Sequence, residues 1–329
     1  MAFQTGIAAD HNDLWSKLLD FLTADPALFA LGQHWTIPWQ GAVGSAYEND
    51  VVLCGPGLGG DEQIYIGLRR NDFSDVNAFH IRMVGMTGIV PTAEQFDQHV
   101  NVSTRHVCMF IDNHPMTYWF VANGRRFVVV VKISTVYEAM YGGLYLPYAD
   151  PITYPYPLFI GGSFGPDADS TLNWTNTATS HRHFVDNRGM GTAAYEYPNR
   201  YSSAYFLDPA AQWWPVNNSN IGTPNTTIAP WQWLGDLGTI TDVSRQVSAP
   251  WQIMHTISPL GGGQVLHPAT LVRDNPSDQT FGVLDGVFHV PGEGNAAENT
   301  VTLDGVDHLV IQNVWRTDEL AYWALALEP

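Results

Sequence analysis

Apolar positions are most concentrated between residues 116 and 133, where they predict two neighbouring strands. Residues 116–122 are apolar and aromatic, and residues 127–133 are rich in β-branched side chains, which favour strands. Between them, Asn123-Gly124 predicts a type I′ hairpin turn, because both central residues of that turn need a positive φ. Neither run alternates with polar residues, so neither strand has a face suited to water. The sequence therefore predicts a hairpin buried on both faces at the centre of a β-rich core.

An amphipathic helix is expected near the N-terminus, within residues 10–31. Its apolar positions recur at i, i+4, i+7 and i+8 and form one stripe, made of Leu14, Leu18, Phe21 and Leu22. Asp10 or Asn12 can cap its start by accepting a backbone N–H. Asp25-Pro26 ends this helix and begins a second one, which Gly32 terminates. The stripe favours packing on the chain's own sheet, and docking on a partner chain is the alternative.

Short strands are expected between this helix and the hairpin, because the apolar period changes to two from residue 35 onward. Turn residues separate the runs. The expected strands are residues 35–40, 51–54, 63–69, 79–86 and 107–111, followed beyond the hairpin by 303–311, while 320–327 fit a strand or a helix. The fold class is therefore mainly β: an antiparallel sandwich or barrel-like core with an N-terminal amphipathic helix and long loops.

The character of the chain changes near residue 162. Residues 163–180 and 217–227 are polar and rich in Gly, Pro, Asn and Thr, as in long loops. We therefore expect three regions: an N-terminal helical segment (1–34), a β core domain (35–162), and a second β-rich, loop- and Trp-rich region (163–329).

The amino-acid composition indicates which kinds of molecule this chain is expected to bind. Aromatic residues make up 12% of the 329 positions, whereas charged residues make up only 14%, against the usual quarter. Few charges on a globular chain are typical of a protein whose surface neighbouring subunits cover. The net charge is −18, and only Lys17 and Lys132 are lysines. Binding to nucleic acid or to an anionic membrane needs a basic surface, so neither partner is expected.

The cysteines and the N-terminus suggest neither disulfides nor export. Cys54 and Cys108 are too few for a disulfide framework and too widely spaced for a zinc site, so two reduced, buried thiols are expected. Residues 1–13 lack the basic and apolar regions of a signal peptide. No apolar run reaches the roughly 18 residues of a membrane span, so no membrane insertion is expected.

Catalytic motifs are incomplete. Residues 161–165 (GGSFG) match Gly-x-Ser-x-Gly, but Pro166 and polar residues follow Ser163 where a nucleophile elbow needs a helix. Residues 56–61 (PGLGGD) lack the Lys-Ser/Thr of a phosphate loop and predict a turn.

The carboxylates that fall in predicted loops are Asp61, Glu62, Asp274, Asp278, Glu293 and Glu298. A glycosidase pair could lie among them, since such pairs need only spatial proximity. We nevertheless expect no enzymatic activity and no cofactor.

Metal ligation is considered at two places and assigned at neither. His181 and His183 have the spacing that puts both rings on one face of a strand, but no third ligand lies nearby. Structural or interface histidines are the preferred interpretation, and metal binding is left open. Asp167 and Asp169 resemble the start of a calcium loop but lack its Gly and bidentate Glu, so they predict a solvated loop.

Two sets of side chains are candidates for an interface or a ligand surface. The first contains Arg125 and Arg126, which follow the hairpin turn in a chain with few cations and are expected to pair with carboxylates, within the subunit or in a neighbour. The second contains Trp213, Trp214, Trp231 and Trp233. Tryptophan is enriched in cores and interfaces, which is the preferred role here, and stacking on sugars is the alternative.

Several blocks of the sequence resemble virion structural proteins encoded in the tail-gene region of tailed bacteriophages. They are YWFVANGRRFVVVVKISTVYEAMYGGLYLPYADPITYPYPLFIGG (118–162), DLWSKLLDFLTADPALFALGQHWTIPW (13–39), GPGLGGDEQIYIGL within 51–90 and, more weakly, SHRHFVDN (180–187). The likeness covers about residues 10–190 and carries no catalytic motif.

This resemblance implies a tail component, with the baseplate or tail tip as the favoured position, present in repeated copies around the tail axis. Its partners would be other tail or baseplate proteins and copies of itself, and it would reach the virion by assembly in the host cytoplasm. The alternative is a host-recognition protein that binds surface carbohydrate through its Trp-rich C-terminal half.

Overall fold

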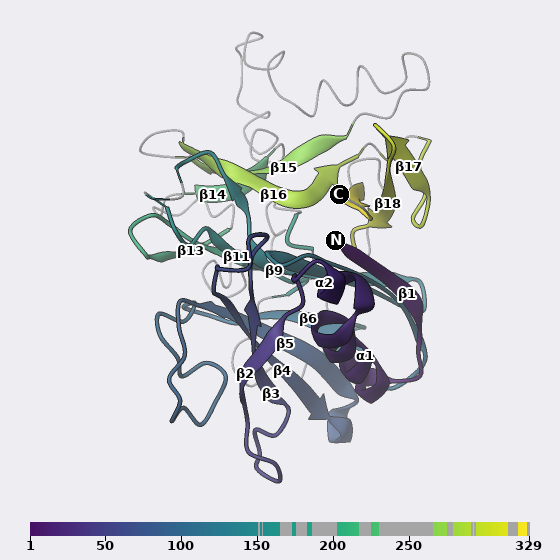
Figure 1. Cartoon of the computed structure of the whole chain (residues 1–329). Coiled ribbons are helices and arrows are strands. Elements are labelled where there is room, and N and C mark those ends of the chain that lie inside the picture. The colour runs from purple at the N-terminus through teal and green to yellow at the C-terminus, as the bar shows by residue number, and fades with distance from the viewer. Residues whose placement is uncertain are drawn as a thin grey trace.

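The structure is a computed structural model of a mainly β chain, as the sequence predicts. It describes residues 1–150, 152, 154–164, 173–175, 183–185, 203–216, 225–229, 266–274, 279–290, 292, 294–314 and 322–327. Three antiparallel sheets lie in layers, with one sheet in the middle (Figure 1). These sheets are open, so the predicted antiparallel sandwich is confirmed and no barrel closes within the described residues.

The central sheet has seven strands. In spatial order they are β1 (Ala2–Ala8), β7 (Met116–Ala122), β8 (Arg126–Ile133), β9 (Val136–Leu144), β11 (Leu158–Gly161), β12 (Ala204–Leu207) and β13 (Trp213–Pro215). The first and last of these come from distant parts of the chain. The predicted hairpin, β7 and β8, therefore lies inside the sheet, with β1 on one side and β9 on the other.

A five-stranded sheet and two helices cover one face of the central sheet. The strands are β2 (Thr36–Gln40), β3 (Asp50–Gly55), β4 (Ile64–Phe73), β5 (Ala78–Met86) and β6 (Val107–Ile111), with the 3-10 turn η1 (Ser74–Val76) before β5. The helices are α1 (His11–Ala24) and α2 (Pro26–Ala30). All five strands were expected, with ends shifted by a few residues.

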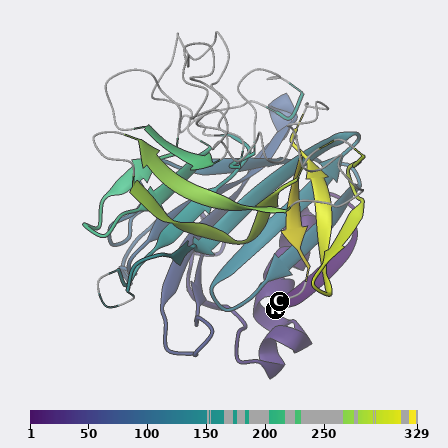
Figure 2. The same cartoon turned by 90° about the horizontal axis from the view of Figure 1, so that it is seen from above.

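The third sheet covers the other face of the central sheet, as the view from above shows (Figure 2). Its strands are β14 (Asn225–Ala229), β15 (His267–Asp274), β16 (Gln279–His289), β19 (Tyr322–Ala326), β18 (Val306–Gln312) and β17 (Thr300–Leu303), and β10 (Leu146–Pro147) pairs with β16. Residues 303–311 are thus not one strand. Asp304 and Gly305, both at positive φ, turn the chain between β17 and β18.

Two apolar cores lie on the two faces of the central sheet, and the hairpin contributes to both. Phe120 and Val129 pack toward the helix and the five-stranded sheet. Val121 and Val128 pack toward the third sheet. Because successive strand residues point to opposite faces, continuous apolar runs are what such a middle layer requires. The predicted burial of the hairpin on both faces is confirmed.

The hairpin turn differs from the predicted type I′ geometry, since neither Asn123 nor Gly124 has a positive φ. Asn123 Oδ1 instead accepts the backbone N–H groups of Arg125 (2.8 Å) and Arg126 (3.0 Å). Glycine is required here by proximity: a Cβ on Gly124 would lie 1.8 Å from the carbonyl oxygen of Gly57. The predicted turn at 56–61 therefore packs directly on the hairpin turn.

The N-terminal helices follow the sequence prediction closely. Asp10 caps α1 by accepting the N–H groups of Asn12 and Asp13, and Asp25 caps α2 in the same way. The apolar stripe of α1 is buried in the chain's own core, which confirms the first of the two alternatives. The preceding strand β1 was not expected. It pairs with β7 along its full length, so residues 1–34 are not a purely helical segment.

The expected boundary at residue 162 does not coincide with a break in the structure. β12 and β13 lie beyond it in the sequence and continue the central sheet next to β11. Buried residues from both sides of the boundary, such as Val128 and Trp323, share one core. The division into 35–162 and 163–329 therefore cuts through a single stack of sheets.

Candidate functional site

Arg126 is an internal residue whose charge is neutralised within the chain. Its side chain is fully buried, and Nε lies 3.4 Å from Oδ2 of Asp285 on β16. Asn123 Nδ2 donates to the same carboxylate oxygen at 2.9 Å. The predicted carboxylate pairing is thus confirmed for Arg126. It joins the hairpin to the third sheet, which removes Arg126 from the candidate interface residues.

Arg125 behaves differently from its neighbour. Its side chain is half-buried, and within the described part of the chain it has no ion pair. Pairing of Arg125 with a carboxylate of a neighbouring subunit stays a prediction. Of the two arginines, it is the one that a partner can reach.

Two of the four candidate tryptophans, Trp213 and Trp214, lie among the described residues. Trp213 is buried against Gly85, and its indole N–H donates to the carbonyl oxygen of Asn101 at 2.8 Å. Trp214 is half-buried and donates to Oδ2 of Asp208 at 2.7 Å. The preferred core role is thus observed for Trp213. Trp231 and Trp233 lie outside the described residues.

The serine of the GGSFG match is held by backbone. Ser163 is fully buried, and its Oγ lies 3.0 Å from the backbone nitrogen and 3.1 Å from the carbonyl oxygen of Ala139. The hydroxyl thus accepts one hydrogen bond and donates another. A nucleophilic serine needs a base beside its Oγ. Among the described residues, the groups hydrogen-bonded to this Oγ are the backbone N–H and C=O of Ala139. The expected glycine turn agrees with this arrangement.

His183 uses both ring nitrogens inside the chain. Nε2 donates to the carbonyl oxygen of Tyr137 at 2.9 Å, and Nδ1 accepts from the indole of Trp323 at 2.9 Å. This describes a neutral, buried imidazole with no lone pair for a metal. The preferred structural role is therefore observed for His183. His181, Asp167 and Asp169 lie outside the described residues, which themselves contain no cluster of three metal-ligating side chains.

Burial shifts the pKa values of Cys54, Cys108 and His80 toward their uncharged forms. Burial raises the pKa of Cys108, and it also raises the pKa of the half-buried Cys54, so both thiols stay protonated. Burial, with a smaller contribution from Arg82, lowers the pKa of His80 to about 3. His80 Nε2 accepts from Asn71 at 3.0 Å and from Arg82 at 3.3 Å. No nucleophile in this group is activated.

Glu298, a candidate for a glycosidase pair, lies in the loop before β17 and links this loop to the central sheet. Its Oε1 accepts from Lys132 at 2.5 Å and from Tyr137 at 2.6 Å, both on the central sheet. Although burial opposes the change, these two hydrogen bonds lower the pKa of Glu298. Asp278 and Glu293 lie outside the described residues.

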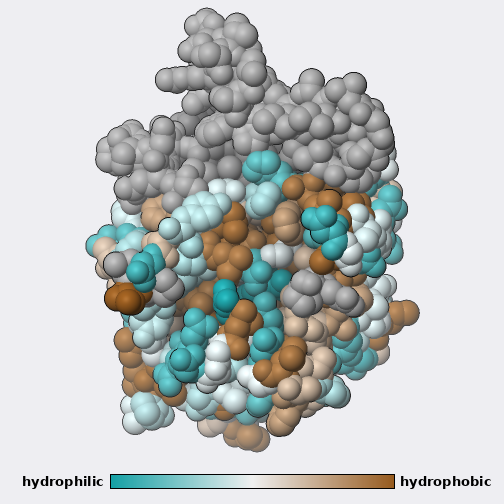
Figure 3. Space-filling model, turned by 45° about the horizontal axis from the view of Figure 1, so that its top comes forward, coloured by the Kyte–Doolittle hydropathy of each residue, from teal (hydrophilic) through white to brown (hydrophobic). Residues whose placement is uncertain are grey.

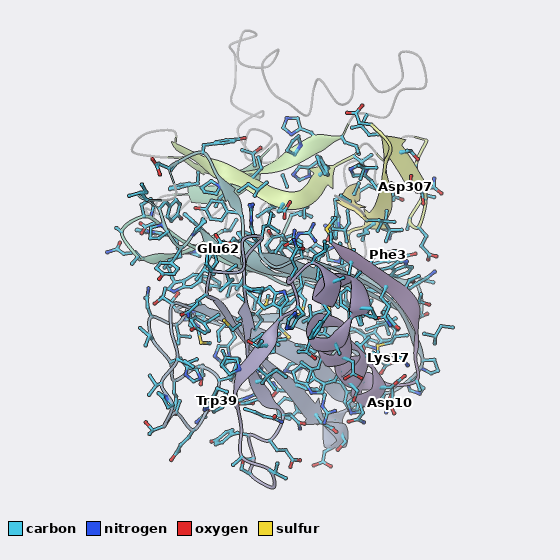
Figure 4. All side chains as sticks on the ribbon, in the orientation of Figure 1. Phe3, Asp10, Lys17, Trp39, Glu62 and Asp307 are labelled. Atoms are coloured by element: carbon cyan, nitrogen blue, oxygen red, sulfur yellow. The ribbon has the colours of Figure 1, made fainter. Side chains whose placement is uncertain are left out.

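Apolar side chains reach the surface in several places, visible as brown patches in Figure 3. On β1, Phe3 is 38% and Ile7 67% exposed, on either side of the exposed Thr5. Figure 4 places Phe3 on this edge strand, with Lys17 and the capping Asp10 on the same side of the molecule. The sequence carries a weak signal for this strand, since the apolar or β-branched side chains of residues 3, 5 and 7 alternate.

A second exposed apolar surface lies on the segment that leaves β10. Tyr148 is 66% and Ile152 88% exposed, and Tyr156 is exposed as well. Burial raises the pKa of Tyr65 at the start of β4, and the nearby Tyr156 adds a smaller contribution in the same direction. We call these three residues the 148–156 surface. Both exposed surfaces lie on strands or loops fixed by neighbouring sheets.

Comparisons with known proteins found no matching family model and no similar curated protein. No helix in the described ranges combines the length and apolar character needed to cross a membrane.

Proposed function

We propose that this chain is a non-enzymatic structural subunit of a bacteriophage tail, located at the baseplate or tail tip. Its role is mechanical: three stacked sheets give a rigid body, and its exposed apolar surfaces bind neighbouring subunits. It assembles with other tail proteins and with copies of itself in the host cytoplasm and then remains in the virion.

The observation that carries this proposal is the combination of few charges with exposed apolar side chains on a rigid scaffold. Only 14% of residues are charged, yet Ile7, Tyr148 and Ile152 stand mostly in solvent. Exposed apolar patches of this kind mark interaction sites. The sequence resemblance to tail-region virion proteins favours a bacteriophage tail as the assembly in which these surfaces bind their partners. The polar groups at the former catalytic candidates, Ser163 and Glu298, are engaged in structural contacts.

The test uses the phage that encodes the chain. Mass spectrometry of purified virions should detect its peptides, and a nonsense mutation in its gene should yield particles with incomplete tails. Complementation with the Ile152→Lys variant should restore assembly less well than complementation with Val43→Lys, a control at a site that is 92% exposed and outside both apolar surfaces. Virions that lack these peptides and assemble normally without the gene would exclude the proposal.

Recognition of host surface carbohydrate is a second candidate, favoured by the exposed rings of Tyr148 and Tyr156. Aromatic faces with a polar tip suit partly wet interfaces. Binding to host polysaccharide that is lost in Tyr148→Ala and Tyr156→Ala, and retained in the neighbouring Ile152→Ala, would support it. Equal binding by all three variants would exclude this surface as the binding site.

A further inference from the structure

The edge strand β1 lacks the features that usually protect sheet edges. Natural edges are shortened, charged, bulged or interrupted by proline, because unpaired N–H and C=O groups can pair with another chain. β1 has seven residues, AFQTGIA, with no charge and no proline, and its register with β7 is unbroken. In Figure 1 it lies at the outer margin of the molecule.

Three other edges of the described sheets are protected. β2 contains Pro38 and a register shift, and β13 has three residues ending in Pro215. On β6, Cys108 is hydrogen-bonded to the backbone of Phe164, which covers that edge. The edge strands β14 and β17 also lack charge and proline but have only five and four residues, so β1 is the longest edge of this kind among the described strands.

One contact to the backbone of β1 comes from outside the sheet. Lys17 Nζ lies 3.3 Å from the carbonyl oxygen of Ile7, and Asp13 neutralises this ammonium group. A carbonyl oxygen has two lone pairs, so this hydrogen bond leaves room for a second one. Within the described residues, no other hydrogen bond from outside the sheet reaches the backbone of β1, and the Lys17–Asp13 pair adds no net charge beside it.

The side chains of β1 are divided between the two faces of the sheet. Gln4 and Gly6 face Tyr118, whose hydroxyl accepts from Gln4 at 3.2 Å and lies 2.8 Å from where a Cβ of Gly6 would be. Phe3, Thr5 and Ile7 point to the opposite face and are exposed. Any strand added at this edge would place its own side chains beside these three.

The sequence of β1 is self-complementary in antiparallel pairing. With Thr5 at the centre, Phe3 of one strand lies opposite Ile7 of the other, and Ala2 lies opposite Ala8. Aromatic and β-branched side chains form favourable cross-strand pairs. No charge faces another charge, although each chain carries −18.

We propose that β1 is the docking edge for β1 of a second copy of this chain. Antiparallel pairing about Thr5 joins two central sheets into one continuous sheet and covers Phe3 and Ile7 of both copies. The interface is the same patch on each subunit, as a two-fold dimer requires. The proposal is independent of the tail assignment, because purified protein is enough to test it.

The first experiment measures the mass of the full-length protein in solution by sedimentation over a range of concentrations. The native protein should dimerise. A Phe3→Lys/Ile7→Lys double variant replaces both apolar pairs by like charges, so its dissociation constant should rise by about tenfold or more. The control, Val43→Lys/Val76→Lys, adds the same charge at exposed sites away from both β1 and the 148–156 surface and should dimerise like the native protein.

A charge exchange tests the register. A Phe3→Glu/Ile7→Glu variant should also be monomeric, and mixing it with the lysine variant should restore a dimer, because each introduced lysine then faces a glutamate. Circular dichroism should show that both variants remain folded. Failure of the mixture to dimerise would overturn the antiparallel pairing about Thr5.

Hydrogen exchange on the native protein gives a reading that does not depend on variants. The amides of residues 2–8 on the free edge should exchange more slowly as protein concentration rises, whereas those of β2 should not change. A native protein that stays monomeric, or a dimer whose β1 amides show no such dependence, would overturn the proposal.

Discussion

At the scale of single residues, adjacent arginines differ because of the direction in which the strand turns them. Arg126 points into the stack and meets Asp285, whereas Arg125 stays half-buried and unpaired within the described chain. Breaking a buried pair leaves one charge uncompensated in a poorly solvated place. Although the two arginines are neighbours in the sequence, their substitutions are therefore expected to change the free energy of unfolding by very different amounts.

We expect Arg126→Met to lower the free energy of unfolding by roughly 3 kcal/mol, because Asp285 then lacks its counter-charge. The matched control, Arg125→Met, should change it by no more than about 0.5 kcal/mol. Urea denaturation followed by circular dichroism measures both values. Equal effects for the two variants would contradict the internal role of Arg126.

His80 predicts a dependence of stability on pH. In the folded chain its pKa is about 3, because burial and the nearby Arg82 disfavour the charged form. The unfolded chain has the ordinary value of about 6.5, so below that pH it binds more protons than the folded chain. The stability due to this group is therefore complete above pH 6.5 and falls as the solution is acidified toward the folded pKa.

Between pH 6.5 and 5 this loss should amount to about 2 kcal/mol, at 1.36 kcal/mol for each pH unit. A His80→Gln variant should lose that much less stability over the same range. His114→Gln, a substitution at an exposed histidine, should retain the pH dependence of the native protein. Urea midpoints at several pH values measure the difference, and identical slopes in all three proteins would refute the prediction.

At the scale of elements, apolar periodicity located the strands from β2 to β8 and both helices, because each has a continuous or regularly spaced apolar pattern. β1 was not predicted, because only Phe3, Thr5 and Ile7 carry its alternating pattern and Gly6 has a low strand propensity. The turn at Asn123 was assigned to the wrong type, since the sequence could not show that Gly57 packs against Gly124. The local sequence allows more than one type of turn at this position, and the contact with a turn from a distant part of the chain decides which type forms.

The cap of α1 provides a test at this scale. Asp10 satisfies two N–H groups that have no partner within the helix, so Asp10→Ala should cost about 1 kcal/mol. Asp20→Ala removes an exposed carboxylate from the same helix and is the matched control, expected to change stability by less than about 0.5 kcal/mol. Thermal unfolding distinguishes the two, and a cap variant as stable as its control would be inconsistent with the assigned role.

At the scale of the whole molecule, the candidate site was harder to anticipate than the fold. Strand patterns follow local apolar periodicity, whereas Arg126, His183 and Glu298 each bind a partner more than 100 residues away in the sequence. Burial of Trp213 likewise depends on how β13 meets β5. The same long-range packing joins the regions on either side of residue 162.

The fragment 1–162 should therefore fail to fold independently. Removal of later residues would expose the face of the central sheet that carries Val121, Val128 and Val130 and would take away β12 and β13. Burial of each large apolar side chain contributes about 1.5–3 kcal/mol, so losing cover over several of them removes on the order of 10 kcal/mol. That is comparable to the whole stability of a typical domain.

The fragment should show no cooperative thermal transition and should bind a hydrophobic dye, whereas the full chain should unfold cooperatively. A fragment that unfolds cooperatively at the temperature of the full chain would instead establish residues 1–162 as a separate domain.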